Sequence, residues 1–194
     1  MHSPLHYGYR LLSLMFAVSF SACTHEKEDE ISTPETPVMI YSSDFENNQQ
    51  PAISDWILMY DYYPGINYDT LVNSTCPEGG SWALNLKAQK LHYSIAEKYL
   101  TNLAGTKDLT LSFYAELISG QNSVTASLIQ IRNGAEIYDE TINLGVWNDW
   151  EQFTFRDSVT LLGTDSLCIR FKALGSTYES SDVMLDRILL EENQ

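Results

Sequence analysis

The segment Leu109-Thr-Leu-Ser-Phe-Tyr-Ala-Glu-Leu117 alternates apolar and polar residues along its whole length. In an extended strand, successive side chains point to opposite faces. The apolar residues of this segment therefore share one face: Leu109, Leu111, Phe113, Ala115 and Leu117. A period of two is typical of a strand with one face in a hydrophobic core, so the segment predicts such a strand.

The same alternation recurs in four further segments: residues 81–87, 124–131, 151–156 and 166–172. Asn133-Gly134 lies between two alternating segments and predicts a tight hairpin. The adjacent Leu128 and Ile129 interrupt the alternation and predict a bulge. About ten short strands separated by turn residues predict an all-β fold, a single antiparallel β-sandwich.

Two segments depart from simple alternation. Residues 95–103 are the one helical candidate, although Tyr93 and Tyr99 make a strand there at least as well supported. Residues 182–190 are apolar on both faces except for Asp186 and Arg187. A strand of this kind is covered on both sides, so we expect it near the centre of the sandwich.

The N-terminal residues carry the pattern of a secretion signal. Arg10 precedes ten uncharged residues, 11–20, and the small pair Ser21-Ala22 follows them. An apolar run this short, behind a basic residue, is typical of a signal peptide rather than a membrane span. Small residues directly before Cys23 resemble the lipobox of bacterial lipoproteins, in which the cysteine is acylated. We expect a lipoprotein signal peptide over residues 1–22; the alternative is an ordinary cleaved signal.

The residues after Cys23 separate the predicted lipid anchor from the domain. Residues 24–37 combine acidic residues and prolines with few apolar groups, so we expect a flexible acidic tether over residues 23–37. The acidic run also resembles a surface-export signal of some Gram-negative bacteria. The resemblance implies an outer-membrane location facing the cell exterior, with membrane contact through the lipid anchor only. The β-sandwich then spans residues 38–194.

The charge of the chain limits its partners. It has 26 acidic and 11 basic residues, a formal net charge of −15. Nucleic-acid binding needs a basic surface that displaces counterions, so nucleic acid is excluded as a partner. Acidic polysaccharides are also disfavoured, whereas neutral sugars or calcium are compatible with this charge. For most of the acidic residues, solubility alone is the alternative explanation.

Two cysteines lie in the predicted domain, Cys76 and Cys168. In an oxidising compartment they could form a disulfide that stabilises the fold by closing a long loop. The alternation places Cys168 on the face opposite Leu167 and Ile169, and nothing in the sequence brings Cys76 to it. A disulfide and two free thiols therefore stay equally open.

Aromatic residues are the positive signal for function. Residues 56–68 contain five aromatic side chains in thirteen positions. Sugar rings stack on aromatic planes while nearby polar groups bind their hydroxyls, and binding sites combine such surfaces. We expect carbohydrate binding by Tyr60, Tyr62, Tyr63 and Tyr68, with Trp147 as a further candidate. A loop packed on its own side chains, or a protein-binding patch, is the alternative, because tyrosine is also enriched at protein interfaces.

The predicted domain lacks the residues that most catalytic mechanisms need. His92 is the one histidine in the predicted domain, whereas a zinc site needs three or four suitable ligands. No serine elbow accompanies His92 to suggest a triad. Glycoside hydrolysis needs only two suitably spaced carboxylates, so it stays open in so acidic a chain.

Several short motifs follow one another along the domain. They are Ser43-Asp-Phe-Glu46, Trp56, Gly79-Gly-Ser-Trp-Ala-Leu-Asn-Leu86, Trp150-Glu-Gln-Phe-Thr-Phe155 and Val183-Met-Leu-Asp-Arg-Ile188. Their order resembles the galactose-binding-like jelly rolls, and among them the carbohydrate-binding modules of bacterial glycoside hydrolases. The resemblance covers nearly the whole domain. It implies a jelly-roll sandwich that binds glycans.

The resemblance also implies a metal ion. In that family, the glutamate of the Phe-Glu pair and the terminal aspartate help to hold a structural calcium ion, and Glu46 and Asp186 match them. Calcium takes six to eight oxygen ligands, so backbone carbonyls and Asp44 would have to contribute. An ion pair, or a position at the exposed end of a strand, is the alternative explanation for Asp186.

These observations lead to one expected function and two alternatives. We expect a non-catalytic cell-surface lipoprotein that captures neutral polysaccharide or oligosaccharide by aromatic stacking. Its partner would be an adjacent glycan-processing or transport protein. The first alternative is a protein-docking or adhesion module with the same sandwich. The second, less favoured, is a carboxylate-based glycoside hydrolase.

Overall fold

The computed structural model describes residues 36–61, 69–120, 124–145 and 148–194, all within the compact unit Pro34–Gln194. The predicted signal peptide, Cys23 and most of the tether lie outside the described residues, so they stay predictions. In the described part of the chain, no helix has the length and apolarity needed to cross a membrane.

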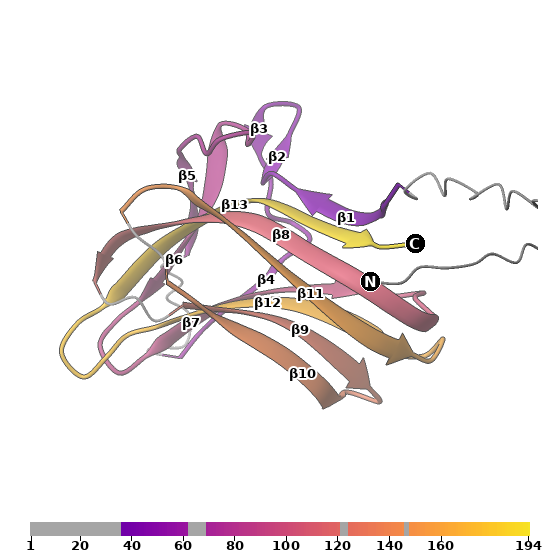
Figure 1. The fold of residues 1–194 in the computed structure, drawn as a ribbon. Helices are drawn as coiled ribbons and strands as arrows, with labels where there is room; N and C mark the ends of the chain where they lie inside the picture. The colour runs from indigo at the N-terminus through magenta and orange to yellow at the C-terminus, as the bar shows by residue number, and fades with distance from the viewer. Residues whose placement is uncertain (1–35, 62–68, 121–123, 146–147) are drawn as a thin grey trace, which may run out of the picture. The chain divides into compact units, whose positions relative to one another are not determined.

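Two antiparallel sheets face one another (Figure 1). The six-stranded sheet has the order β11 (Glu151–Leu161), β8 (Gly105–Gly120), β13 (Ser181–Glu192), β6 (Trp82–Ala88) and β5 (Thr70–Asn73), and β1 (Val38–Ser43) also pairs with β13. The five-stranded sheet has the order β10 (Ala135–Leu144), β9 (Val124–Arg132), β12 (Ser166–Leu174), β7 (Tyr93–Leu100) and β4 (Ile57–Tyr60). A short pair, β2 (Glu46–Asn47) and β3 (Gln50–Pro51), stands apart. The predicted all-β antiparallel sandwich is confirmed.

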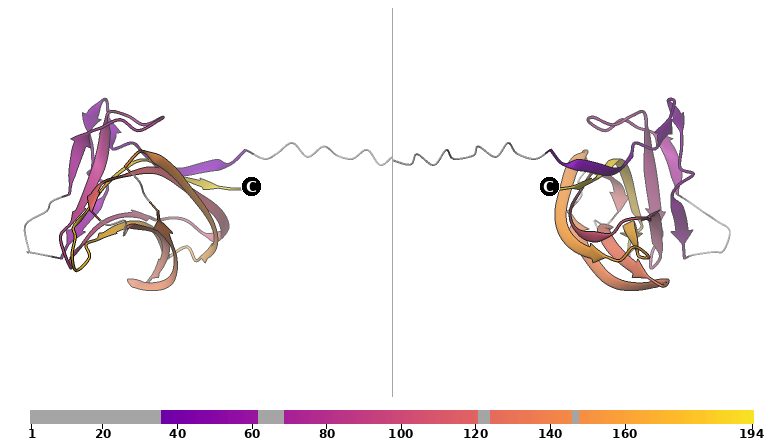
Figure 2. Two further views of the ribbon diagram at one scale, coloured as in Figure 1. Left: turned by 60° about the vertical axis from the view of Figure 1, so that its left-hand side comes forward. Right: turned by 90° about the vertical axis from the view of Figure 1, so that its right-hand side faces the viewer.

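The predicted core strand is β8. Its five alternating apolar residues are all buried in the core between the sheets, as the period of two requires. The predicted central strand is β13, which pairs with β8 on one side and with β6 and β1 on the other. β1 pairs with the C-terminal end of β13 and is the edge strand of the sheet there (Figure 2).

Aromatic rings join the two sheets. Phe171 of β12 is fully buried, and its ring centroid lies 4.8 Å from that of Phe113 of β8 at an interplanar angle of 77°. The Trp56 ring centroid lies 6.0 Å from that of Phe171 at an interplanar angle of 38°. Aromatic pairs of this kind stabilise the fold beyond the burial of their surface, so Phe171 is a specific contact through which the sheets pack.

Two local predictions are settled by the backbone. Asn133 and Gly134 have φ angles of 53° and 79° between β9 and β10, which is the geometry of the predicted tight hairpin. Residues 93–100 form β7, so the strand alternative is correct and the helix is not. Tyr93 and Tyr99 suit the surface of a sheet better than a helix interior.

The bulge predicted at Leu128 and Ile129 is wrong. The register between β9 and β12 runs without a shift through both residues. Leu128 packs in the core between the sheets, whereas Ile129 is buried on the other face of β9. The irregularity lies in the partner strand, between Glu136 and Tyr138 of β10. Two adjacent apolar residues therefore mark a point at which both faces of the strand are buried.

Of the two alternatives for Cys76 and Cys168, the structure has the free thiols, and both are buried. Leu167 and Ile169 take the core face of β12, which turns Cys168 to the outer face of the five-stranded sheet. Cys76 lies in the loop between β5 and β6, beside Asp186 of the six-stranded sheet. The two thiols therefore lie in different parts of the sandwich.

Phe171→Ala should lower the free energy of unfolding by about 3–5 kcal/mol, because it removes the ring that bridges the sheets and leaves a cavity. Urea denaturation of the wild type and the variant measures this loss. Tyr178→Ala, at a side chain that is 77% exposed, is the control and should change stability little. A loss below about 1 kcal/mol for F171A would contradict the packing described.

Candidate functional site

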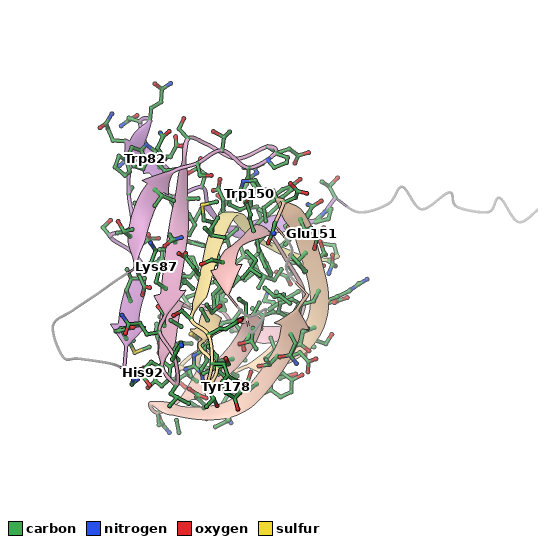
Figure 3. All side chains as sticks on the ribbon, turned by 90° about the vertical axis from the view of Figure 1, so that its left-hand side faces the viewer. Trp82, Lys87, His92, Trp150, Glu151 and Tyr178 are labelled. Carbon is green, nitrogen blue, oxygen red and sulfur yellow. The ribbon has the colours of Figure 1, made fainter. Side chains whose placement is uncertain are left out.

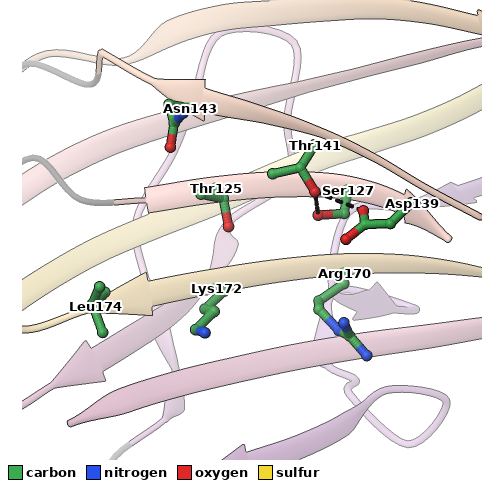
Figure 4. A pocket seen from close by; sticks show the side chains of 8 residues that line it. All are labelled: Thr125, Ser127, Asp139, Thr141, Asn143, Arg170, Lys172 and Leu174. Carbon is green, nitrogen blue, oxygen red and sulfur yellow. Dashed lines mark hydrogen bonds between the residues drawn. The ribbon is translucent and has the colours of Figure 1, made fainter. Parts of the chain in front are cut away.

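The outer face of the five-stranded sheet contains a hollow of about 330 Å³, called here the outer-face hollow (Figure 4). Eight residues from three adjacent strands line it: Thr125, Ser127, Asp139, Thr141, Asn143, Arg170, Lys172 and Leu174. Strand alternation explains this composition, because the intervening residues of the same strands fill the core.

The strand register sets these side chains in rows across the sheet. Arg170 of β12 lies between Glu97 of β7 and Ser127 of β9, and Thr141 of β10 continues the row. In an antiparallel sheet, directly opposed residues lie about 4.5–5.5 Å apart and on the same face. The row is therefore a continuous polar strip across four strands.

A second row runs parallel to the first and is mixed in character. Lys172 lies between Ile95 of β7 and Thr125 of β9, and Asn143 extends the row onto β10. Met59 of β4, which is 37% exposed, ends it on the other side. This row thus passes from an apolar end to a polar end.

Hydroxyl groups dominate the β9–β10 side of the outer-face hollow. The Ser127 and Thr141 hydroxyl oxygens lie 2.6 Å apart, and the Thr141 hydroxyl also donates to Asp139 Oδ1 at 2.6 Å. Asn143 is exposed on β10 beside them. These groups can both donate and accept hydrogen bonds, as recognition of hydroxyl groups on a ligand requires.

Carboxylates hold Arg170 on both sides. Its Nε donates to Glu97 Oε1 and its Nη2 to Glu136 Oε1, each at 2.5 Å. Burial opposes the positive charge of Arg170, but these two hydrogen bonds raise the pKa of its guanidinium group. The hydrogen bond from Arg170 lowers the pKa of Glu136. Tyr99 also donates to Glu97, at 2.7 Å. The guanidinium group is thus fixed in place and its charge is neutralised.

The β4–β7 side of the same face is apolar and aromatic. The ammonium group of Lys172 lies 4.9 Å from the centroid of the Tyr93 ring. Leu174, 41% exposed, pairs with Tyr93, and Ile57 and Met59 continue the apolar surface on β4. The sheet thus presents an apolar platform next to a strip of hydrogen-bonding groups. This combination is suited to a ligand that has both flat C–H faces and hydroxyl groups.

Most of the predicted sugar-binding residues lie outside the described residues: Tyr62, Tyr63, Tyr68 and Trp147. Tyr60 is described. It is the last residue of β4 and pairs with the buried Ser94, and its hydroxyl accepts the Gln89 N–H at 3.4 Å. It is not among the residues that line the outer-face hollow.

Four residues of the outer-face hollow were not predicted as site residues from the sequence: Arg170, Lys172, Thr141 and Asn143. The available signal was their position: each is a polar residue opposite a core residue in an alternating strand. Alternation alone does not show which strands are neighbours or in which register they pair. These residues form one site only because β12, β9 and β10 are neighbours in the sheet.

The predicted metal ligands lie on the side of the six-stranded sheet: Asp186 in its central strand β13, Glu46 in β2 and Asp44 between β1 and β2. Glu46 Oε1 accepts the backbone N–H of Trp82 at 2.9 Å and also that of Ser81. Asp44 Oδ1 accepts the backbone N–H of Glu46 at 3.2 Å. Gly80 passes so close to Glu46 that a Cβ atom at that position would collide with the carboxylate. Glu46 is therefore tied to the loop before β6.

Asp186 is fully buried in β13, and one of its oxygens, Oδ2, has no hydrogen-bond partner among the described residues. The Cys76 thiol lies beside this carboxyl group, but it donates to the Pro77 carbonyl at 3.2 Å. Burial raises the pKa of Asp186 to about 6, and the charges of Asp44 and Glu46 add to the effect. A cation bound beside these carboxyl groups would stabilise their charged forms.

The fit of this cluster to calcium is partial. The buried Oδ2 of Asp186 is a suitable cation ligand, and Gly79 is packed against it where a Cβ atom would collide. Within the described ranges, however, no three His, Cys, Asp or Glu side chains are grouped as a metal site. Backbone carbonyls would therefore have to supply much of a calcium shell.

Comparison with known proteins identifies the fold. No protein-family model matches the sequence, and no curated protein resembles it. Among solved structures, the CBM22-1 xylan-binding domain of Paenibacillus barcinonensis Xyn10C has a TM-score of 0.54 at 14% identity, covering 84% of this chain and 99% of that one. The family 11 carbohydrate-binding module of Clostridium thermocellum Lic26A-Cel5E has a TM-score of 0.55 at 13% identity, covering 84% and 97%.

Part of an enzymatically active domain also resembles this fold. The enzymatically active domain of bacteriophage CBA120 tailspike protein 4 has a TM-score of 0.57 at 14% identity, covering 72% of this chain. The match takes up only 19% of the tailspike chain. At these identities the similarity shows the fold alone, a β-sandwich of the jelly-roll type seen in carbohydrate-binding modules.

Asp186→Asn should change how stability depends on pH. The pKa of Asp186 is about 6 in the folded protein against about 4 in the unfolded chain, so the folded state holds the proton more tightly between these values. In a chelator, the wild type should therefore lose about 2 kcal/mol of stability through this group as the pH rises from about 4 to about 7. D186N should not show this loss. Urea denaturation of both proteins at the two pH values measures the loss of stability. If the wild type and D186N lose the same stability between these pH values, the raised pKa of Asp186 is contradicted.

Proposed function

We propose that this chain is a non-catalytic protein that binds a neutral polysaccharide across the outer face of the five-stranded sheet. The observation that carries the proposal is the pairing of an apolar and aromatic platform on β4 and β7 with the hydroxyl and amide groups of β9 and β10. Pyranose rings have the two matching surfaces, because they carry C–H faces and ring hydroxyls. Similarity in fold to a xylan-binding domain supports this ligand class.

The charge of the site favours a neutral ligand. The positive charge of Arg170 is already balanced by Glu97 and Glu136, and among the other lining residues the carboxylate of Asp139 offsets the ammonium group of Lys172. The whole chain is strongly acidic as well. A polysaccharide of uronic acids would therefore be repelled by the acidic surface as it approaches the site.

The same residues argue against glycoside hydrolysis at this site. Hydrolysis of a glycosidic bond generally needs two carboxyl groups on either side of it. Asp139 is the one carboxylate among the eight residues that line the outer-face hollow. Glu136 is bound to Arg170, which lowers its pKa and makes it a poor general acid near neutral pH. Binding without turnover is the function that fits this set.

The proposal includes the cellular setting that the N-terminal residues indicate. Acylated Cys23 would anchor the domain in the outer membrane, and the acidic tether would hold it toward the exterior. Several acyl chains give stable anchoring where a single chain does not. A protein placed in this way would hold polysaccharide for an adjacent glycan-processing enzyme or transporter.

Asn143→Ala tests the binding site. Removal of one amide that bonds a ligand hydroxyl should weaken binding about 3- to 10-fold, the effect of about 0.5–1.5 kcal/mol for one hydrogen bond. Migration of the purified full chain in native gels that contain neutral plant, mucin-derived or microbial polysaccharides measures the binding.

The matched control is Asn73→Ala, at an exposed asparagine of β5 in the other sheet. It should bind like the wild type. If the wild type is retarded and both variants retain full binding, the glycan site lies elsewhere. If no polysaccharide retards the wild type, the protein-docking alternative gains support.

A structural calcium ion at Asp186 and Glu46 is part of the proposal. Calcium that binds only the folded state raises its stability by about 2.7 kcal/mol at a concentration 100 times its Kd. A chelator should therefore lower the melting temperature of the wild type and leave D186N unchanged. Equal melting of the wild type with and without chelator would contradict calcium binding.

A further inference from the structure

A second hollow, of about 200 Å³, lies on the six-stranded sheet where β13 begins, and is called here the β13 hollow. It is lined by residues 87–89 at the end of β6, Ser119 near the end of β8, and residues 180–182 at the start of β13. Its strands belong to the opposite sheet from the outer-face hollow, so the two hollows share no residue. Figure 3 shows Lys87 on β6, next to β13.

The strand register builds one wall of the β13 hollow. Asp182 lies opposite Lys87 of β6 on one side and Ser119 of β8 on the other. Its Oδ1 accepts the Asn85 Nδ2–H at 2.7 Å, and its Oδ2 lies 3.6 Å from the Lys87 ammonium group. Because Lys87 and Asp182 largely neutralise each other, the wall offers hydrogen bonds with little net charge.

Hydroxyl and amide groups complete the lining of the β13 hollow. Ser119 and Ser180 are exposed, and Gln89 is half-buried. The Ser181 hydroxyl is not part of this surface, because Ser181 is fully buried and shares the core face of β13 with Val183 and Leu185. The hydroxyl groups of Ser119 and Ser180 can donate and accept hydrogen bonds, as the hydroxyls of a sugar ring require.

Glycines bring the walls together. Gly120 has a φ of +92° at the end of β8, and a Cβ atom there would collide with the Ser180 carbonyl. Likewise, a Cβ atom at Gly175 would collide with the Gln89 carbonyl. Both sides of the β13 hollow are therefore held by close backbone contacts that only glycine allows. The hollow is thus set by the backbone, which favours a pre-formed site.

We propose that the β13 hollow is a second carbohydrate site, which binds a single neutral sugar ring. Its volume is below the range of about 300–1,000 Å³ that is usual for larger ligands. Its lining of hydroxyl, amide and paired charged groups matches the hydroxyls of one ring. The outer-face hollow would hold a stretch of chain, and the β13 hollow a terminal or branch residue. Two sites on opposite sheets would let one domain bridge two polysaccharide chains and raise the avidity.

Saturation-transfer difference NMR on the full chain, in a detergent without sugar groups, tests this proposal. The probes are the methyl glycosides of galactose, glucose, mannose and xylose at millimolar concentration, because a single ring is expected to bind weakly. We expect a signal from at least one glycoside. Ser119→Phe should abolish this signal by filling the β13 hollow. Ile118→Phe, at the exposed neighbour that does not line it, should keep the signal.

The variants separate this inference from the proposed function. Asn143→Ala should weaken retention by polysaccharide and leave the methyl glycoside signal intact, whereas S119F should do the reverse. The inference is overturned if no glycoside gives a signal, if S119F keeps the full signal, or if N143A removes it. Failure of N143A to weaken polysaccharide retention would count against the proposed function alone.

Discussion

The packing of Phe171 against Phe113 is the contact on which the rest of the structure depends. Because β12 is extended, placing Phe171 and Ile169 in the core forces Arg170 and Lys172 to the outer face. The same constraint acts on β9, where Ala126 and Leu128 face inward and Thr125 and Ser127 outward. The candidate site is thus formed by the outward-facing residues of the strands whose inward-facing residues form the core. A one-residue slip in register would exchange the two faces and destroy both the core and the site.

Arg170 links this packing to function. It lies on β12 near the middle of the outer face, and its two carboxylate partners come from the neighbouring strand β7 and from β10, which lies beyond β9 on the other side. Its side chain is only one-fifth exposed, so water weakens these hydrogen bonds less than it would on an open surface. The three strands are therefore fixed relative to one another in the region that would contact a ligand. A pre-formed surface of this kind binds with less loss of conformational entropy.

The sequence predicts the strands well and the site poorly. Alternation in residues 109–117 identifies β8 and its buried face, and Asn133-Gly134 identifies the hairpin, because both signals are local. Arg170 and Asn143 become neighbours of one hollow only through the pairing of β12 with β9 and of β9 with β10. The sequence left the pairing of Cys76 and Cys168 open for a related reason: Cys76 lies in the loop before β6 and Cys168 in β12 of the other sheet, and no local pattern shows how far apart two such segments lie.

Binding of a neutral glycan to the outer face of the five-stranded sheet is most directly tested by an NMR titration. The isotopically labelled protein is titrated with the neutral oligosaccharide whose parent polysaccharide retards it in gels. We expect the shifted backbone signals to cluster on β9, β10 and β12, around Arg170 and Asn143. Shifts confined to the six-stranded sheet, or the absence of any shift, would rule out binding at this face.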